Sequence, residues 1–185
     1  MAYPRGTAVT AYFDRRQQIL SRIFANLGTL SIPLLGGPNG PVTIVPGNIV
    51  HNRNELPAEK VPGIILLDAD EVRDTRQMQP PPGLVQRAVP SALYKMTPEI
   101  YVVLDVRPVS NDGANMGEDL NTARLAILGA TLPDTYLQEL VSANGNIVYD
   151  GCVTDLARNR TMKGQLGISI SFVYPLLPNE YIGIN

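Results

Sequence analysis

Residues 165–174 decide the fold, and they read Gln165-Leu-Gly-Ile-Ser-Ile-Ser-Phe-Val-Tyr174. A large apolar side chain occupies every second position, and most of the positions between them are small or polar. Successive side chains of a β-strand point to opposite faces of the sheet. The stretch therefore predicts a strand with one buried face and one small, polar face. The buried set would be Leu166, Ile168, Ile170, Phe172 and Tyr174.

Further strands are predicted upstream of this stretch. Residues 146–156 would pair with it as a hairpin across the connection 157–164. Residues 99–107 also alternate, and we expect Ile100, Val102 and Leu104 to line the same buried face. A turn at Thr97-Pro98 would pair residues 86–96 with 99–107 as a second hairpin. The continuous apolar run at 63–68 predicts a buried strand.

Three segments show helical spacing instead. Residues 11–27 carry apolar side chains at intervals of three and four and end before Gly28. Residues 118–128 and 133–143 follow the same pattern. Short turns join most of the strands, which favours antiparallel pairing. We therefore expect one α+β domain over residues 1–185, with a mainly antiparallel sheet and helices packed on one face.

Two Pro/Gly-rich excursions, at 29–60 and 70–90, interrupt this pattern as long loops or arms. Only a short strand at 42–45 is expected in the first one. Isolated apolar side chains in exposed loops gain little unless a partner covers them, so these excursions are the predicted subunit or partner contacts. Deletion of residues 33–47 should then leave the monomer folded. The candidate contact residues are Leu34, Leu35, Ile44, Met78 and Leu84.

Basic residues at 157–164 form a further candidate contact. Arg158, Arg160 and Lys163 lie at the predicted tip of the last hairpin. They could contact a partner or a neighbouring subunit, remain solvated, or touch DNA phosphate, although three charges are too few to hold DNA alone.

No catalytic, cofactor-binding or metal-binding residues are predicted. His51 is the sole histidine and would be needed for a Ser-His-Asp triad, but no Gly-x-Ser-x-Gly elbow accompanies it. Cys152 is the sole cysteine and falls in the middle of a predicted strand, where a buried small apolar residue is the usual case. We expect an ordinary loop histidine and an inert thiol.

An acidic group follows the predicted strand at 63–68. Asp68, Asp70, Glu71 and Asp74 could bind Mg²⁺ or Ca²⁺, but their spacing lacks the glycine and terminal glutamate of an EF-hand loop. A solvated turn or a salt-bridge surface between subunits is the favoured interpretation, and cation binding stays open.

Composition favours a protein whose surface is covered by partners. Of the 185 residues, 44% are hydrophobic and only 17% are charged, against about 25% charged in typical domains. The formal net charge of −2 argues against a dedicated nucleic-acid binder. A single cysteine fits a reducing cytosol, and no apolar run approaches the length of a membrane span.

The layout of four segments resembles tail-terminator (tail-completion) and related neck proteins of tailed bacteriophages. The segments are Arg22-Ile-Phe-x-x-Leu27, the run from Leu56 to Glu71, Pro98-Glu-Ile-Tyr-Val-Val-Leu104, and Gly164 to Tyr174. The resemblance implies a small α+β subunit that forms a ring, usually a hexamer, which caps the tail tube and provides the joint to the head. It supplies no catalytic residues.

From this resemblance we expect a structural virion protein, assembled in the host cytoplasm. Its partners would be further copies of itself, the tail tube protein, and a head-completion or adaptor protein. DNA would only pass through the lumen, and no membrane is involved. A head–tail adaptor, head-closure protein or minor tail component is the alternative within this class. A small ligand-binding protein or enzyme is the alternative outside it, and would show a large apolar pocket with converging polar groups.

Overall fold

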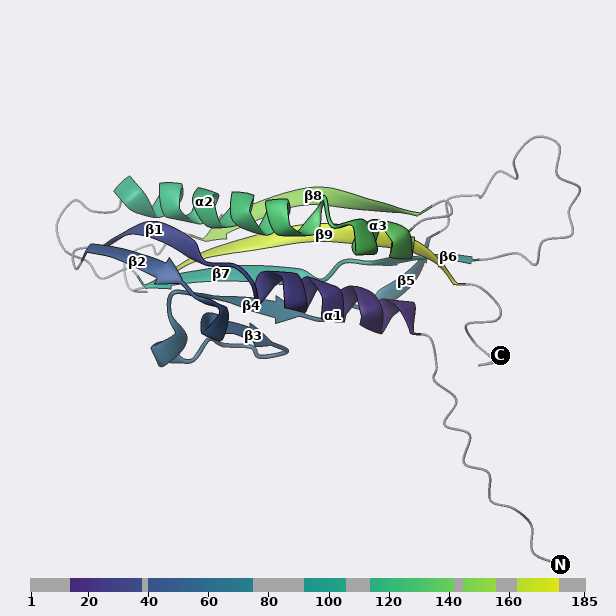
Figure 1. The fold of residues 1–185 in the computed structure, drawn as a ribbon, viewed down its shortest axis with the longest axis horizontal. Coiled ribbons are helices and arrows are strands. Elements are labelled where there is room, and N and C mark those ends of the chain that lie inside the picture. Colours follow the sequence, from purple (N-terminus) through teal and green to yellow (C-terminus); the bar gives the residue numbers. More distant parts are fainter. Residues whose placement is uncertain are drawn as a thin grey trace, which may run out of the picture.

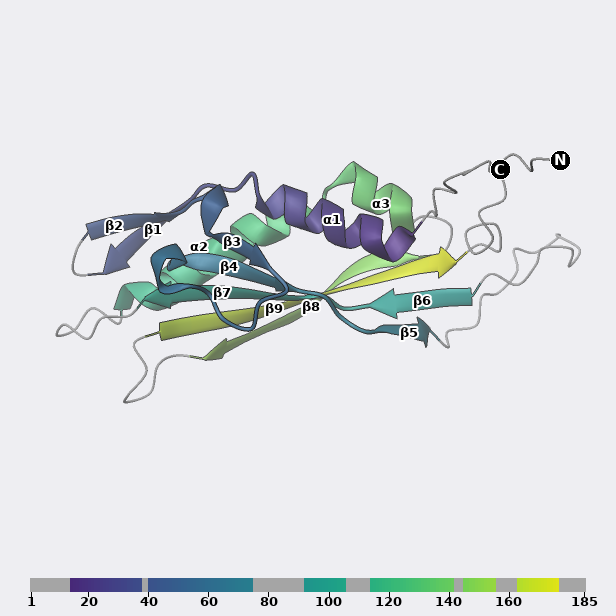
Figure 2. The same ribbon diagram turned by 90° about the horizontal axis from the view of Figure 1, so that it is seen from below.

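The computed structural model describes residues 14–37, 40–74, 92–105, 114–141, 145–155 and 163–176. Helices cover one face of a mainly antiparallel sheet, so the predicted α+β class is confirmed (Figures 1 and 2). No helix in these ranges has both the length and the apolar character that a bilayer crossing needs. The helices are α1 (Arg15–Leu27), α2 (Ala114–Thr131) and α3 (Thr135–Val141), with 3-10 turns η1 (Pro46–Asn48) and η2 (Ala58–Lys60). The strands are β1 (Ile32–Gly37), β2 (Gly40–Ile44), β3 (Ile49–His51), β4 (Gly63–Leu67), β5 (Glu71–Asp74), β6 (Ala92–Met96), β7 (Glu99–Asp105), β8 (Asn146–Asp155) and β9 (Lys163–Leu176).

Helix α1 forms where the apolar spacing predicted it. The Asp14 side chain accepts a hydrogen bond from the Gln17 N–H and so caps the first turn. Gly28 ends the helix. The buried face faces the sheet and consists of Ile19, Leu20, Ile23 and Leu27.

Polar contacts hold α1 against the turn between α2 and α3. Arg22 donates two hydrogen bonds to Asp134 Oδ2, at 3.0 and 2.7 Å. Asn26 donates to the same carboxylate oxygen at 3.0 Å. The other oxygen of Asp134 accepts from the Leu137 N–H at 2.8 Å and so caps α3. Arg22 therefore has a structural role in joining the helices.

Among the described residues, three strands of the main sheet pair on one side only and so form its edges, namely β3, β5 and β8. Strand β9 pairs with β8 along one side and with β7 and β6 along the other, always antiparallel. Strand β4 pairs with β7, and β3 pairs with β4 in parallel. The predicted hairpin of β8 and β9 is therefore confirmed.

The predicted hairpin around Thr97-Pro98 is wrong. Strands β6 and β7 run in the same direction along β9, with Met96 opposite Phe172 and Glu99 opposite Ser169. They are two parts of one long strand that is interrupted at Pro98. Proline lacks the N–H that a ladder needs, so it interrupts the pairing here without reversing the chain.

The strands beside the Pro98 interruption are interrupted as well. Residues 68–70 separate β4 from β5, which pair with β7 and β6 respectively. Strand β8 has a bulge between Tyr149 and Gly151. Ser171 joins these irregularities, because its hydroxyl hydrogen-bonds with Thr97 and with the Asp150 carboxylate. The strands cross one another in Figure 2 near the middle of the sheet, where these interruptions lie. The sheet therefore twists strongly where the pairing is interrupted.

The core lies between the helices and the sheet, and the predicted buried face is confirmed. It contains Leu166, Ile168, Ile170, Phe172 and Tyr174 of β9 together with Ile100, Val102 and Leu104 of β7. The second face of β9 is more buried than expected, because Ser171 and Val173 are also buried. A smaller cluster on this second face comprises Val50, Leu56, Ile65 and Val103.

The prediction of a structureless excursion at 29–60 is wrong. This segment contains the β1–β2 hairpin, η1, β3 and η2. Leu34 and Ile44 are buried in the main core, and β1 packs against α2. Deletion of residues 33–47 would therefore remove core side chains, so the monomer is not expected to survive it intact.

The second excursion is described only in part. Strand β5 accounts for residues 71–74. Met78, Leu84 and the proline run at 80–82 lie outside the described residues.

Candidate subunit interface

The β1–β2 hairpin forms a small sheet of its own and carries apolar side chains to the surface. In this hairpin Leu34 pairs with Val42 and Ile32 pairs with Ile44. Three large side chains are substantially exposed, namely Leu35 (50%), Val42 (38%) and Val45 (41%). We call Leu35, Val42 and Val45 the hairpin patch. Val42 pairs with Leu34 and so lies on the other face of the hairpin from Leu35, and Val45 follows β2.

Only one of the three candidate contacts in this segment lies at the surface. Leu35 is exposed, whereas Leu34 and Ile44 are buried inside the subunit. The prediction that Leu34 and Ile44 contact a partner is therefore wrong, because their apolar surface is already covered by the chain's own core. Neighbouring residues of a strand face opposite ways, which explains why Leu34 and Leu35 differ.

A buried carboxylate holds the hairpin in place. The Leu35 N–H donates to Asp119 Oδ1 at 2.6 Å, and Asp119 on α2 is almost fully buried. A hydrogen bond to a charged acceptor in a buried setting is stronger than an exposed one. The hairpin patch is thus presented on a fixed support. Sequence analysis did not identify this role, because Leu35 and Asp119 are 84 positions apart.

The edge strand β8 carries a second exposed surface. Cys152, Val153 and Thr154 are all exposed, and Val153 reaches 77%, the highest value among the large apolar side chains described. The expectation of a buried Cys152 is therefore wrong, although the residue does lie within a strand. It is exposed because β8 is an edge strand that pairs on one side only.

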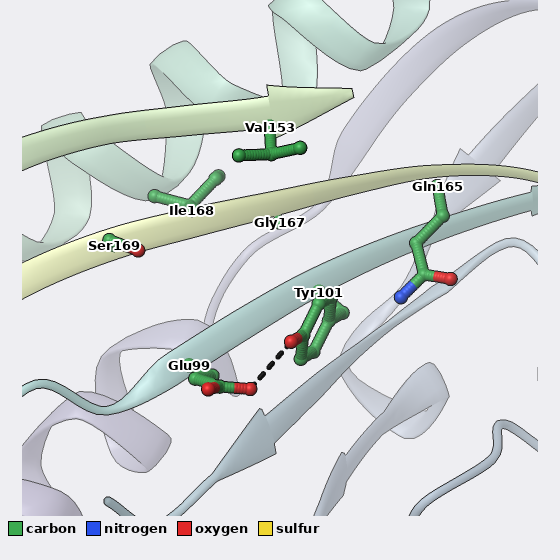
Figure 3. A pocket seen from close by; sticks show the side chains of 7 residues that line it. All are labelled: Glu99, Tyr101, Val153, Gln165, Gly167, Ile168 and Ser169. Carbon is green, nitrogen blue, oxygen red and sulfur yellow. Dashed lines mark hydrogen bonds between the residues drawn. The ribbon is translucent and has the colours of Figure 1, made fainter. Parts of the chain in front are cut away.

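An open groove adjoins this edge on the sheet face that the helices leave uncovered. It has a volume of about 420 Å³, and Tyr101, Gly167 and Val153 line it from three neighbouring strands (Figure 3). The Tyr101 hydroxyl donates to Glu99 Oε2 at 2.5 Å. That hydrogen bond, and then burial, raise the pKa of Tyr101 above its ordinary value. The groove therefore offers apolar surface beside one carboxylate that is already bonded.

His51 belongs to a structural cluster at the opposite edge of the sheet. Its Nε2 lies 2.6 Å from Asp68 Oδ1, and its ring stacks on Phe24 at a centroid distance of 5.3 Å. Asn52 Oδ1 accepts from the Asp68 N–H at 3.0 Å. These contacts tie β3 to the end of β4 and to α1. His51 and Cys152 lie on opposite edge strands, so they do not form a catalytic pair.

The cluster predicts a pH-dependent contribution to stability. Burial alone would raise the pKa of Asp68, but hydrogen bonds from Asn52 and His51 outweigh it and lower the pKa below its ordinary value. A lowered folded-state pKa stabilises the protein above the unfolded-state pKa of about 4, and this contribution disappears as the pH falls through the folded-state value. Asp68→Asn should cost about 1 kcal/mol at neutral pH, and the difference from wild type should shrink between pH 5 and pH 3.

Urea unfolding of both proteins across this pH range measures the effect. Asp70→Asn is the matched control. Asp68 is hydrogen-bonded to His51 and Asn52, whereas no hydrogen bond between described residues involves the Asp70 carboxylate. A pH-independent difference between wild type and Asp68→Asn would contradict the assignment.

The acidic group after β4 is divided among different partners. Asp68 faces His51, whereas Glu71 Oε2 accepts from the Tyr174 hydroxyl at 2.6 Å. In the described part of the chain, no three His, Cys, Asp or Glu side chains are grouped so that they could hold a metal ion. The geometry therefore gives cation binding at this group no support.

Of the three basic candidate residues in the connection between β8 and β9, the structure describes only Lys163. Lys163 is the first residue of β9 and pairs with Asp105 of β7. Arg158 and Arg160 lie outside the described residues.

No protein-family model matches the sequence, and no curated protein matches it. The interpretation of function thus depends on the layout of the sequence and on the surfaces described above.

Proposed function

We propose that this chain is a non-enzymatic structural subunit of a tailed-bacteriophage virion. It forms a ring, in keeping with the hexamers of the family it resembles, that caps the tail tube and joins the tail to the head–neck complex. Its partners are further copies of itself, the tail tube protein and a head-completion or adaptor protein, and DNA passes through the lumen. A single subunit of 185 residues cannot surround a tube, so this function requires an oligomer.

The observation that supports the proposal most is the hairpin patch. Leu35, Val42 and Val45 are exposed on a hairpin that Asp119 anchors to α2. Full burial of a large apolar side chain contributes about 1.5–3 kcal/mol, and these side chains are about half exposed. Covering all three would therefore contribute roughly 2–4 kcal/mol before ordering costs. Fixed apolar groups of this kind suit a repeated contact between subunits.

The test compares two exposed leucines. Leu35→Asp places a charge in the hairpin patch and should reduce ring formation on purified tail tubes by about tenfold or more, while the melting temperature stays near that of wild type. Leu125→Asp is the matched control, because Leu125 is similarly exposed but lies on α2. Negative-stain imaging counts rings, and circular dichroism checks the fold.

Two results would contradict the proposal in different ways. If wild-type protein forms no rings on tail tubes or heads, the proposed function is wrong. If rings form but Leu125→Asp disrupts them and Leu35→Asp does not, the contact lies on α2 instead. Rings found at heads but never at tubes would favour a head–tail adaptor or head-closure protein.

A further inference from the structure

We propose that the free edge of β8 at residues 151–155 receives strand β2 of a second copy of this chain, so that the neighbour's hairpin extends the main sheet. The inference rests on the proposed function, because it assumes that the subunits assemble. It goes further in naming both surfaces of the contact and the kind of bonding between them, a backbone hydrogen-bond ladder.

The outer edge of β8 is open for pairing. Strand β8 pairs with β9 along its length, and no other strand in the described ranges pairs with it. An edge strand presents a row of backbone N–H and C=O groups to whatever lies beside it. The exposure of Cys152, Val153 and Thr154 shows that side chains do not cover this part of the edge.

Strand β8 has little of the usual protection of an edge beyond its bulge. Proteins commonly protect edge strands with lysine, proline, β-bulges or inward-pointing charges. Strand β8 contains no lysine, arginine or proline, and its charged residues are Asp150, which bonds to Ser171, and Asp155 at its end. The bulge between Tyr149 and Gly151 divides the edge. The five residues beyond it, 151–155, can accept a strand, and Gly151 itself has a φ of 122°.

Strand β2 is the segment of this chain that fits that edge. It spans five residues, Gly40–Ile44, and contains no charged side chain. It pairs with β1 alone, so its other edge is also free of pairing among the described strands. Pro41 is acceptable there, because proline in sheets is largely confined to edge strands. The other edge strands of the main sheet, β3 and β5, have only three and four residues.

The positions of the two surfaces favour head-to-tail assembly. The hairpin lies on the helix side of the main sheet, whereas the C-terminal end of β8 lies at the same end of the molecule on the opposite side (Figure 2). A contact between two different surfaces of identical subunits repeats around a ring or a helix. Pairing of β8 with itself would instead be two-fold and would stop at a dimer.

The groove beside β8 gives the incoming hairpin an apolar contact. Val153 belongs both to the exposed edge and to the lining of the groove, together with Tyr101 and Gly167 (Figure 3). An exposed side chain of the hairpin patch, such as Val42, could lie against this surface. The pairing would then cover Val153 and an exposed side chain of the hairpin at once.

Each contact would be weak alone. A pairing of five residues buries much less than the roughly 800 Å² per partner of a stable interface. Closure of a ring, or support from a tail tube, would hold several such contacts together. Covalent capture is therefore a better assay than the affinity of the isolated chain.

The experiment uses Cys152 as a natural probe on β8. Thr43→Cys and Val42→Cys are made separately, because neighbouring residues point to opposite faces and a disulfide needs Cα atoms within about 7 Å. Mild oxidation in the presence of tail tubes should give a ladder of cross-linked multimers beyond the dimer in at least one variant. The ladder should vanish in the matched Cys152→Ser background. Leu125→Cys serves as the control for random cross-linking.

The outcomes separate this inference from the proposed function. Val153→Lys should also reduce ring formation about tenfold or more with an unchanged melting temperature. Rings that form normally while neither hairpin variant gives a Cys152-dependent ladder would overturn the strand pairing and leave the ring itself intact. Cross-linking that stops at Cys152–Cys152 dimers would show that β8 pairs with itself. Wild-type protein that forms no rings would overturn both proposals.

Discussion

Ile168→Asp is expected to unfold the protein. Ile168 is 1% exposed in β9, between Ile100 of β7 and Cys152 of β8, and its side chain belongs to the main core. An aspartate there would bury a carboxylate without a partner, in addition to losing apolar burial of about 1.5–3 kcal/mol. The total cost of several kcal/mol is comparable to the stability of a whole domain, about 5–15 kcal/mol. Circular dichroism and urea unfolding measure it.

Val153→Asp is the matched control for this prediction. Val153 lies one strand away, but on the exposed face of β8. Its replacement introduces the same carboxylate into solvent and should change the free energy of unfolding by less than about 1 kcal/mol. An Ile168→Asp variant that melts at the wild-type temperature would show that this face of β9 is not the core.

Gly63→Ala is expected to cost about 3 kcal/mol or more. A Cβ at this position would collide with the carbonyl oxygens of Asn48 and Lys60 and would lie 2.8 Å from Leu56 Cδ2. Two of the three obstacles are backbone atoms, which cannot rotate away as a side chain can. Overpacking of a core site usually costs 1–3 kcal/mol, and a backbone clash belongs at the upper end. The midpoint of urea unfolding should fall accordingly.

Gly129→Ala provides a control with the opposite sign. Gly129 lies within α2, and a Cβ there would meet no atom within 4 Å. Alanine is a better helix former than glycine by up to about 1 kcal/mol, so this variant should be slightly more stable than wild type. Equal effects of the two substitutions would mean that the packing around Gly63 is looser than the structure indicates.

The spacing of the apolar residues predicted the structure best where one period ran through a whole helix or strand. Alternation predicted the buried face of β9, and helical spacing predicted α1 with its end at Gly28. These patterns are reliable because burial of one face is the main driving force for each element. They led directly to the α+β class.

The predictions were wrong where proline and glycine, which usually indicate turns or loops, lie within strands of the folded chain. Thr97-Pro98 is typical of a turn, but here it interrupts one long strand that keeps its pairing with β9. Proline and glycine at 29–60 suggested a loop, yet apolar residues such as Ile32 and Ile44 gain enough from burial in the core to form a hairpin. Both outcomes depend on partners that are distant in the chain.

The composition of the candidate interface is visible in the amino-acid sequence alone, namely few charges, Leu35 among the apolar residues of the hairpin, and an uncharged stretch around Val153. Which of these residues reach solvent depends on the folded arrangement of the chain. Leu34 and Ile44 face the core, Leu35 does not, and Cys152 and Val153 are exposed because β8 lies at the edge of the sheet. The physical reason is that exposure depends on which segments cover a residue, and an edge exists only once the strands have been ordered in space.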